Sequence, residues 1–175
     1  MFACTYQTDP AITLVSPNAD THKRHLQLLI DNTRKAWVGQ EDIWDERKLD
    51  KFFDNCAKEE AQSDDERTSY FYAIERSNRC IGIIGIHLSS YLIRNEFRYI
   101  VTMCYFTTTL TQIGIQILDM ALTQFWKHNP SETVYMDVPV KNSTMSLIAK
   151  RLGFQQGYQH KYNQILYTRF TNRRR

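Results

Sequence analysis

The stretch FRYIVTMCYFTTTLTQIGIQILDMALTQFWKHNPSETVYMDVPV, residues 97–140, decides the fold. Residues 97–106 and 133–140 are rich in β-branched and aromatic side chains and predict two strands. A helical stripe of apolar side chains lies between them: Ile117, Leu118, Ala121, Leu122 and Phe125. Because a helix that connects two strands of one sheet makes a right-handed crossover, we expect these two strands to be parallel.

The rest of the chain predicts further elements on both sides of this unit. In chain order they are a strand at 11–16, helices at 22–32 and 45–61, strands at 69–76 and 80–93, a helix at 142–152 and a two-stranded hairpin over 153–170. Asp20 or Thr21 is expected to cap the first helix. The prediction is an α/β (α+β) fold with a mixed, mostly antiparallel, six- to seven-stranded sheet flanked by about four helices.

Length and composition favour one domain over residues 1–175, with a core at about 10–170 and a basic C-terminal tail at 171–175. No apolar run approaches the roughly 18 residues of a membrane span, and the N-terminus lacks the pattern of a secretory signal. The four cysteines form no CxxC pair, and His22 and His25 have no third ligand type beside them. We therefore expect a reduced, cytoplasmic protein with no metal and no membrane partner.

The charge is unevenly distributed. Residues 41–66 hold 11 of the 19 acidic residues against 4 bases, whereas the chain from Arg67 onward holds 5 acids and 14 bases. The acidic stretch is either an ordinary solvated helix surface or a wall that attracts a cationic substrate. The terminal residues 173–175 are all arginine, which is more typical of a solvated tail than of a nucleic-acid site.

The junction over residues 104–116 is the first chemical signal. A strand ends near Phe106, a loop with several threonines follows, and the next helix carries Gly114 in its first turn. A helix N-terminus offers unpaired backbone N–H groups and the positive end of the helix dipole, so it binds phosphate well. Many strand–loop–helix junctions bind nothing, so this signal is weak when taken alone.

A second signal is the run VPVKNSTMSLIAKRLGFQQGY, residues 138–158. Its Asn142, Ala149, Gly153 and Phe154 resemble the pattern N-x-x-S-x-x-x-A-x-x-x-G-F of the GNAT superfamily of acetyl-CoA-dependent N-acetyltransferases. The order of elements and the length also match that family over about residues 10–170. The opening segment, with two tryptophans and LDKFF after it, is similar to the branch that acetylates the N-termini of ribosomal proteins, and to aminoglycoside and polyamine relatives.

The resemblance implies that the junction cradles the pyrophosphate of acetyl-CoA. The family loop R/Q-x-x-G-x-G/A falls on residues 109–114, where Gly114 is kept but Thr109 and Gln112 depart from the pattern. A glycine lets the backbone approach phosphate closely, so Gln112 either clashes or donates a substitute hydrogen bond. The implied acetyl-CoA residues are Cys104, Tyr105, Phe106, Thr107, Thr109, Thr111, Gln112, Ile113, Gly114, Ile115 and Asn142.

Direct attack of an amine on the thioester needs a proton acceptor and backbone donors for the carbonyl. The family resemblance assigns the backbone donors to residues 104–107. For the base we favour Glu96, at the start of the same strand, with Asp137 second. Taken alone, Glu96 is more typical of an ordinary exposed carboxylate at a strand end than of a catalytic base.

The acid that protonates the departing sulfur is unassigned. Many family members use a Tyr or a Ser on the helix after Asn142, but this chain has Ala149 and Met145 at those positions. Tyr105 and Tyr158 are the alternatives. Cys104 also lies in this region, and it is more typical of a small buried residue than of a nucleophile.

Three functions compete. The first is an N-acetyltransferase that acts on a primary amine of a protein N-terminus, a polyamine or an aminosugar, with the acidic stretch favouring a cationic acceptor. The second is a catalytically degenerate GNAT-fold module that binds acyl-CoA or a protein, which Thr109, Gln112, Ala149 and Met145 motivate. The third, a nucleic-acid binder, fits the C-terminus alone. A homodimer is compatible with all three.

Overall fold

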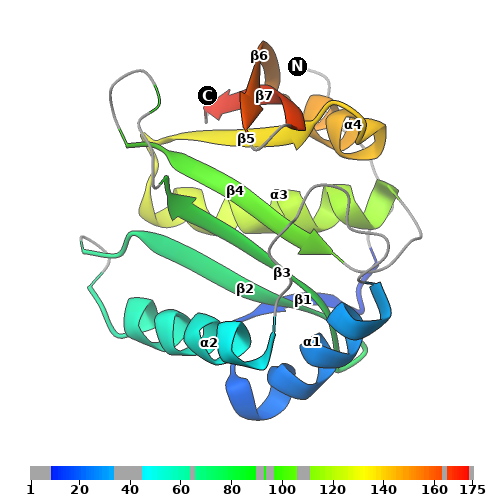
Figure 1. The fold of residues 1–175 in the computed structure, drawn as a ribbon. Coiled ribbons are helices and arrows are strands. Elements are labelled where there is room, and N and C mark those ends of the chain that lie inside the picture. Colours follow the sequence, from blue (N-terminus) through cyan, green and yellow to red (C-terminus); the bar gives the residue numbers. More distant parts are fainter. Residues whose placement is uncertain are drawn as a thin grey trace.

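The chain folds around one seven-stranded sheet with helices on both faces (Figure 1). The computed structural model describes residues 9–33, 45–63, 66–89, 93, 97–105, 111–162 and 165–173. Their elements are β1 (Ile12–Val15), α1 (Ala19–Thr33), α2 (Glu46–Glu60), β2 (Ser69–Arg76), β3 (Arg79–Leu88), β4 (Tyr99–Tyr105), α3 (Thr111–His128), β5 (Thr133–Pro139), α4 (Ser143–Arg151), β6 (Gln155–Tyr162) and β7 (Ile165–Arg173). This order confirms the fold class predicted from the sequence.

The strands are arranged in the order β1-β2-β3-β4-β5-β7-β6. β4 and β5 are parallel, as the crossover helix α3 between them predicts, and the other neighbouring pairs are antiparallel. β2 and β3 are joined by Ser77 and Asn78, whose φ angles of 51° and 61° are those of a type I′ hairpin turn. The sheet is therefore mixed and mostly antiparallel.

The two faces of the sheet are covered by different helices. α3 and α4 pack on one face, where a large core includes Ile84, Phe125 and Val134, all fully buried. α1 and α2 pack on the other face, around Leu26 and Leu49. Figure 1 shows α1 and α2 in front of the sheet and α3 behind it. The α1–α2 helices lie over the β1–β3 half, so they do not reach across the whole front face.

Two local predictions need correction. The side chain of Asn18, and not Asp20 or Thr21, caps α1, because its Oδ1 accepts from the backbone N of both residues at 2.9 and 3.3 Å. The strand expected over 80–93 ends at Leu88. The backbone N of Ser89 still donates to the carbonyl of Arg98 at 2.8 Å, one position beyond the last pair of β3 with β4, and residues 90–92 lie outside the described residues.

Candidate functional site

The parallel strands β4 and β5 separate soon after they meet. Over the described residues of both strands, they pair only at Tyr99 with Val134 and Ile100 with Tyr135. β4 still pairs with β3 as far as Tyr105, and β5 with β7 as far as Pro139. Figure 1 shows the two arrows diverging toward their C-terminal ends. We call residues 101–105 of β4 and 136–139 of β5 the fork.

The fork leaves one backbone edge of β4 without a strand partner in the described part of the chain. Such an edge presents N–H and C=O groups that an extended ligand can pair with. α3 begins at Thr111, six residues after β4 ends at Tyr105. The backbone N–H groups of its first turn, which have no partner within the helix, therefore lie near the C-terminal end of β4. The arrangement suits a long ligand with an amide-bearing arm and an anionic end.

Several residues that the sequence assigns to acetyl-CoA border this fork. Cys104 and Tyr105 form the last rungs of β4, opposite Ile83 and Gly82 of β3. Thr111 and Gln112 form the start of α3. Four of the predicted positions lie outside the described residues: Phe106, Thr107, Thr109 and the proposed base Glu96. Their roles stay predictions.

The side chains of Ile113 and Ile115 are 4% and 0% exposed and belong to the core. These two residues can therefore contribute only backbone groups to a ligand. Gly114, between them, packs against α4: a Cβ at this position would lie 2.6 Å from Cδ1 of Ile148. The missing side chain is therefore explained by helix–helix packing, a reason different from the close phosphate approach expected from the sequence.

Asn142 is the N-cap of α4. Its side-chain oxygen accepts from the backbone N of Met145 at 3.0 Å, and its own backbone N donates to the carbonyl of Pro139 at 2.7 Å. Asn142 thus links the end of β5 to the start of α4, on one side of the fork. This capping role accounts for an Asn at this position and leaves its predicted contact with acetyl-CoA a prediction.

Side chains alternate between the two faces along the fork strands. Val134, Met136 and Val138 of β5 enter the core beneath α3 and α4. Tyr135 and Asp137 therefore point to the opposite face, where Tyr135 packs with Ile93 and Ile100. We call this the front face, since α1 and α2 also lie on it.

Asp137 makes a buried ion pair on the front face. Arg169 of β7 is 4% exposed. It donates two hydrogen bonds to the carboxylate, from Nε to Oδ1 at 2.8 Å and from Nη2 to Oδ2 at 2.6 Å. Nε2 of His160 lies 3.1 Å from the same Oδ1. The two oxygens of this carboxylate are thus both occupied by the guanidinium. Asp137 is thus a weak candidate for the base.

Arg169 also connects Asp137 to Tyr158, one of the two tyrosines considered as the acid. Nη1 of Arg169 donates to the Tyr158 hydroxyl at 2.8 Å. Tyr158 is 52% exposed, so its ring reaches the surface of the β6–β7 hairpin. Arg169 and His160 could not be assigned to this cluster from the sequence, because they come close to Asp137 only through the pairing of β5 with β7 and of β7 with β6.

His87 on β3 was also missed. It lies opposite Ile100 of β4 in the strand register, and Ile100 lies opposite Tyr135 of β5. The three side chains form a row across the front face at the point where the fork begins. The ring of His87 stacks on that of Phe71, with centroids 6.1 Å apart. Burial lowers the pKa of His87.

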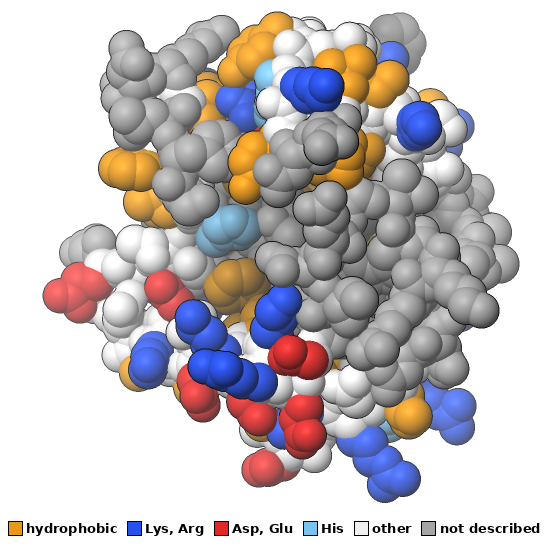
Figure 2. Space-filling view, viewed as in Figure 1, with side chains coloured by type: hydrophobic (Ala, Val, Ile, Leu, Met, Phe, Trp, Pro, Cys, Tyr) orange, Lys and Arg blue, Asp and Glu red, His pale blue; other side chains and the backbone are white. Residues whose placement is uncertain are grey.

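Acidic residues of the 41–66 stretch have partners within the protein. Glu46 and Asp50 contact Lys23, at 3.3 and 2.6 Å. Glu59 accepts from the backbone N of Thr68 and of Ser69, which ties α2 to the start of β2. Figure 2 shows acidic and basic side chains intermixed in the region of α2. Glu46, Asp50 and Glu59 therefore have partners within the protein.

Two negative findings hold for the described ranges. No helix there is both long and apolar enough to cross a membrane. No group of three or more His, Cys, Asp and Glu side chains is placed there to hold a metal ion.

No family model and no curated protein matches the sequence. Solved structures do match. A ribosomal-protein alpha-N-acetyltransferase, RimL, in complex with coenzyme A is 14% identical with a TM-score of 0.75, covering 97% of each chain. The protein yncA from Salmonella typhimurium, solved with its cofactor acetyl-CoA, is 10% identical with a TM-score of 0.69, covering 93% of this chain and 94% of the other.

A spermidine N-acetyltransferase chimera from Vibrio cholerae and hSSAT is 12% identical, with a TM-score of 0.65 over 92% of this chain and 94% of its own. Similarity at these identities shows the fold. The chain has the fold of the GNAT acetyltransferases, which confirms the resemblance seen in residues 138–158.

Proposed function

We propose that the chain is an N-acetyltransferase that moves an acetyl group from acetyl-CoA to a primary amine. The observation that carries this proposal is the fork, where an edge of β4 that pairs with no strand among the described residues runs toward the N-terminus of α3. An amide-containing arm pairs with a strand edge, and phosphates bind at a helix N-terminus. Coenzyme A has both groups in that order.

In this proposal the backbone of Cys104, Tyr105, Phe106 and Thr107 binds the arm and the thioester carbonyl. Thr109, Thr111 and Gln112 bind the phosphates with backbone N–H groups and side-chain donors, together with the backbone of residues 113–115. Backbone N–H groups aimed at the carbonyl oxygen stabilise the charge that develops there during attack. Asn142 holds the opposite side of the fork by capping α4.

The reaction requires no covalent enzyme intermediate. The neutral amine attacks the thioester carbon, the C–N bond forms as the C–S bond breaks, and the sulfur leaves with a proton. Glu96 is the proposed base for the ammonium proton, and Tyr105 is the proposed donor to the sulfur. Asp137 is not favoured as the base, because Arg169 occupies both of its oxygens.

The acceptor is proposed only as a primary amine. One structural neighbour is described as a ribosomal-protein alpha-N-acetyltransferase and another as a spermidine N-acetyltransferase, so the same fold serves both peptide and polyamine acceptors. The acidic stretch lends little support to a polyamine, since Glu46, Asp50 and Glu59 are paired within the protein.

The departures at Thr109 and Gln112 favour a second candidate, a GNAT-fold module that binds acyl-CoA without catalysis. Calorimetric titration with acetyl-CoA, followed by an acetylation assay on a panel of peptide, polyamine and aminosugar amines, separates the two. The enzyme proposal predicts saturable 1:1 binding and acetylation of at least one amine. Binding without acetylation leaves the second candidate, and no binding at millimolar acetyl-CoA rejects both.

The proposed base has its own test. Glu96→Gln keeps size and polarity but removes basicity, so turnover should fall by roughly 10²–10⁴-fold with acetyl-CoA affinity unchanged. The loss should shrink as the pH rises, because more of the acceptor is already neutral. Glu66→Gln, at an exposed carboxylate before β2, is the matched control. Unchanged turnover of Glu96→Gln assigns the base elsewhere.

A further inference from the structure

The C-terminal part of the chain has a strongly unbalanced charge. Residues 138–175 hold eight Lys and Arg residues and no Asp or Glu. In Figure 2 the side chains coloured over β6 and β7, at the top of the view, are basic, hydrophobic or uncharged polar ones, and the acidic ones gather around α2. Five of the bases are exposed in the part of this segment that the structure describes: Lys141, Lys150, Arg151, Lys161 and Arg173.

The turn of the β6–β7 hairpin lies at the open end of the fork. β6 ends and β7 begins where Tyr162 pairs with Ile165. Two residues further along β7, Tyr167 pairs with Pro139, the last residue of β5. Because β4 and β5 diverge toward their C-terminal ends, this turn stands beside the mouth of the fork. A ligand chain that leaves the fork at this end meets the hairpin.

Two lysines flank a small apolar surface at this place. Leu166 pairs with Lys161 of β6, and its carbonyl accepts from the backbone N of Val140 at 2.9 Å. Lys141 follows Val140 directly. Val140 and Leu166 are 42% and 45% exposed, and Tyr162 at the end of β6 is 61% exposed. Only two strand spacings of about 4.8 Å separate Lys161 from Val140, so these five residues form one surface, which we call the hairpin patch.

The acidic residues that the structure describes around this end of the sheet leave the charge of the patch uncompensated. The last acidic residue before the C-terminal segment is Asp137, and Arg169 donates to both of its oxygens. Glu46 and Asp50 of α2 contact Lys23. Among the described residues, the charges that the hairpin patch offers to a ligand are therefore those of its two lysines.

We propose that the hairpin patch binds an acidic segment of a polypeptide whose amine is acetylated at the fork. This inference rests on the proposed acetyltransferase function and names its acceptor. Carboxylates of the segment would pair with Lys141 and Lys161, and an apolar residue between them would cover Val140 and Leu166. A polyamine or an aminosugar is cationic, so the two lysines repel it. The patch therefore favours acidic peptides over other primary amines.

Two other anionic ligands are the alternatives. The phosphates of CoA are proposed to bind at the start of α3, whereas Lys141 precedes α4 and Lys161 lies on β6. A nucleic acid would bring phosphates to both lysines. Its backbone has no apolar side chain to cover the exposed Val140 and Leu166 between them. An apolar pair flanked by two positive charges suits a peptide better than either alternative.

The test measures acetylation of three peptides that share their N-terminal residues and then carry a run of Glu, Gln or Arg, none of which adds a second amine. In about 0.01 M salt, the wild type should have a kcat/KM about tenfold or more higher for the Glu peptide than for the Gln peptide, and the Arg peptide should be slowest. The preference should shrink in about 1 M salt, because the Debye length falls from about 30 Å to about 3 Å.

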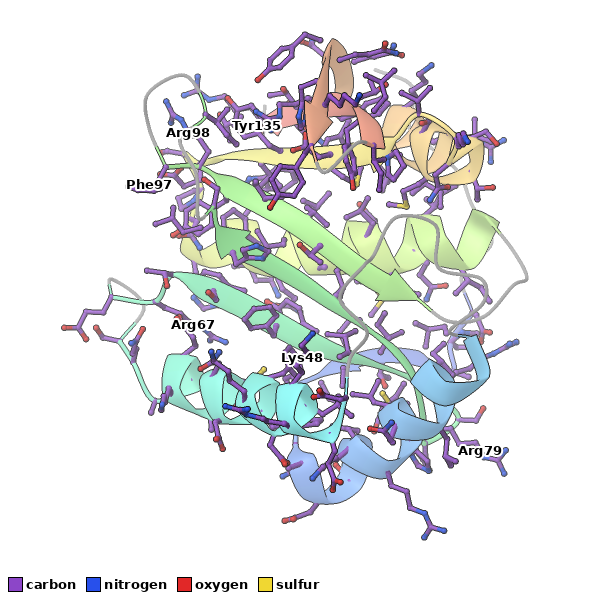
Figure 3. All side chains as sticks on the ribbon, viewed as in Figure 1. Lys48, Arg67, Arg79, Phe97, Arg98 and Tyr135 are labelled. Carbon is purple, nitrogen blue, oxygen red and sulfur yellow. The ribbon has the colours of Figure 1, made fainter. Side chains whose placement is uncertain are left out.

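Charge reversal in the hairpin patch should weaken this preference. Lys141→Glu and Lys161→Glu should each lower kcat/KM for the Glu peptide by about fivefold or more, mainly through KM, with the affinity for acetyl-CoA unchanged. Arg79→Glu is the matched control, because it changes the net charge by the same amount at an exposed residue of β3. Figure 3 shows Arg79 at the lower right, away from β6 and β7 at the top. This control should keep the wild-type preference.

Equal kcat/KM of the wild type for the Glu and Gln peptides, or faster acetylation of a polyamine, overturns the inference and leaves the acetyltransferase proposal intact. Lost affinity for acetyl-CoA in the lysine variants also overturns it, since it assigns the lysines to the cofactor. Binding of single-stranded RNA that both lysine variants lose, without any peptide preference, assigns the patch to nucleic acid instead.

Two further outcomes keep the inference testable. If a lysine variant does not fold, the salt dependence of the wild type decides, and a preference that persists unchanged in about 1 M salt overturns the role of charge. A wild type that acetylates no amine refutes the acetyltransferase proposal, and this inference with it.

Discussion

Gly114 offers a sharp test of how α3 and α4 pack. Replacing it with alanine adds a methyl group 2.6 Å from Cδ1 of Ile148, a side chain that is 3% exposed. Favourable carbon–carbon contacts are about 3.5–4.0 Å, so the overlap is close to 1 Å. The valine variant Ile148→Val removes the clashing atom and leaves Cγ1, which would lie at 3.7 Å, an ordinary contact distance.

The magnitudes follow from this geometry. Overpacking of a core costs about 1–3 kcal/mol, and Gly→Ala within a helix gains up to about 1 kcal/mol. Gly114→Ala alone should therefore lower the free energy of unfolding by about 0–2 kcal/mol. In the Ile148→Val background the clash is absent, so the same change should stabilise by up to about 1 kcal/mol, and the coupling equals the overpacking cost of about 1–3 kcal/mol.

Urea unfolding of the four proteins measures this coupling, and calorimetry with CoA on the same proteins measures affinity. We expect the double variant to bind CoA like Ile148→Val, because the added methyl points toward α4 and the backbone N–H of residue 114 is kept. A coupling below about 0.3 kcal/mol refutes the packing explanation. A selective loss of CoA affinity in both backgrounds would show instead that phosphate approaches this glycine.

Other residues give further predictions. Asp137→Asn or Arg169→Met should each lower the free energy of unfolding by about 3–5 kcal/mol in urea titrations, because each change leaves its ion-pair partner without a counter-charge. Replacing both residues with apolar side chains should cost much less. Burial raises the pKa of Cys56 to about 12 and that of Cys80 to about 11. Both thiols should therefore resist alkylation at pH 8 until urea unfolds the protein, and rapid alkylation of either thiol in the folded protein would contradict this prediction. Asn142→Ala should cost about 1 kcal/mol through the lost cap and Asn142→Asp far less, as thermal unfolding would report, and equal losses would exclude the capping role.

Sequence patterns predicted the order of elements because each element carries its own periodicity. Residues 69–76 form β2 with the predicted bounds, and the α3 stripe ends at Asn129–Pro130 as expected. The parallel pair followed from chain connectivity alone. One helix cap was predicted wrongly: Asn18 caps α1 in place of Asp20 or Thr21, because several neighbouring polar residues can all cap a helix.

The site was harder to predict because it depends on pairing between distant strands. Asp137 was considered as a base, but its partner Arg169 lies 32 positions away and becomes its neighbour only through the β5–β7 register. His87 has no local motif, and its position beside the fork depends on the β3–β4 register. A phosphate-binding role for Gly114 was predicted from a loop motif. In the structure the absence of a side chain is explained by the close packing of Ile148, on another helix, against this position.

Hydrogen exchange with and without CoA tests the central proposal, that CoA binds along β4 and at the N-terminus of α3. We expect CoA to slow exchange most in residues 101–116, because the ligand would accept hydrogen bonds from backbone N–H groups there. α2, over residues 46–60, serves as the internal reference and should change little. Protection centred on α2, with residues 101–116 unchanged, would contradict the proposed site.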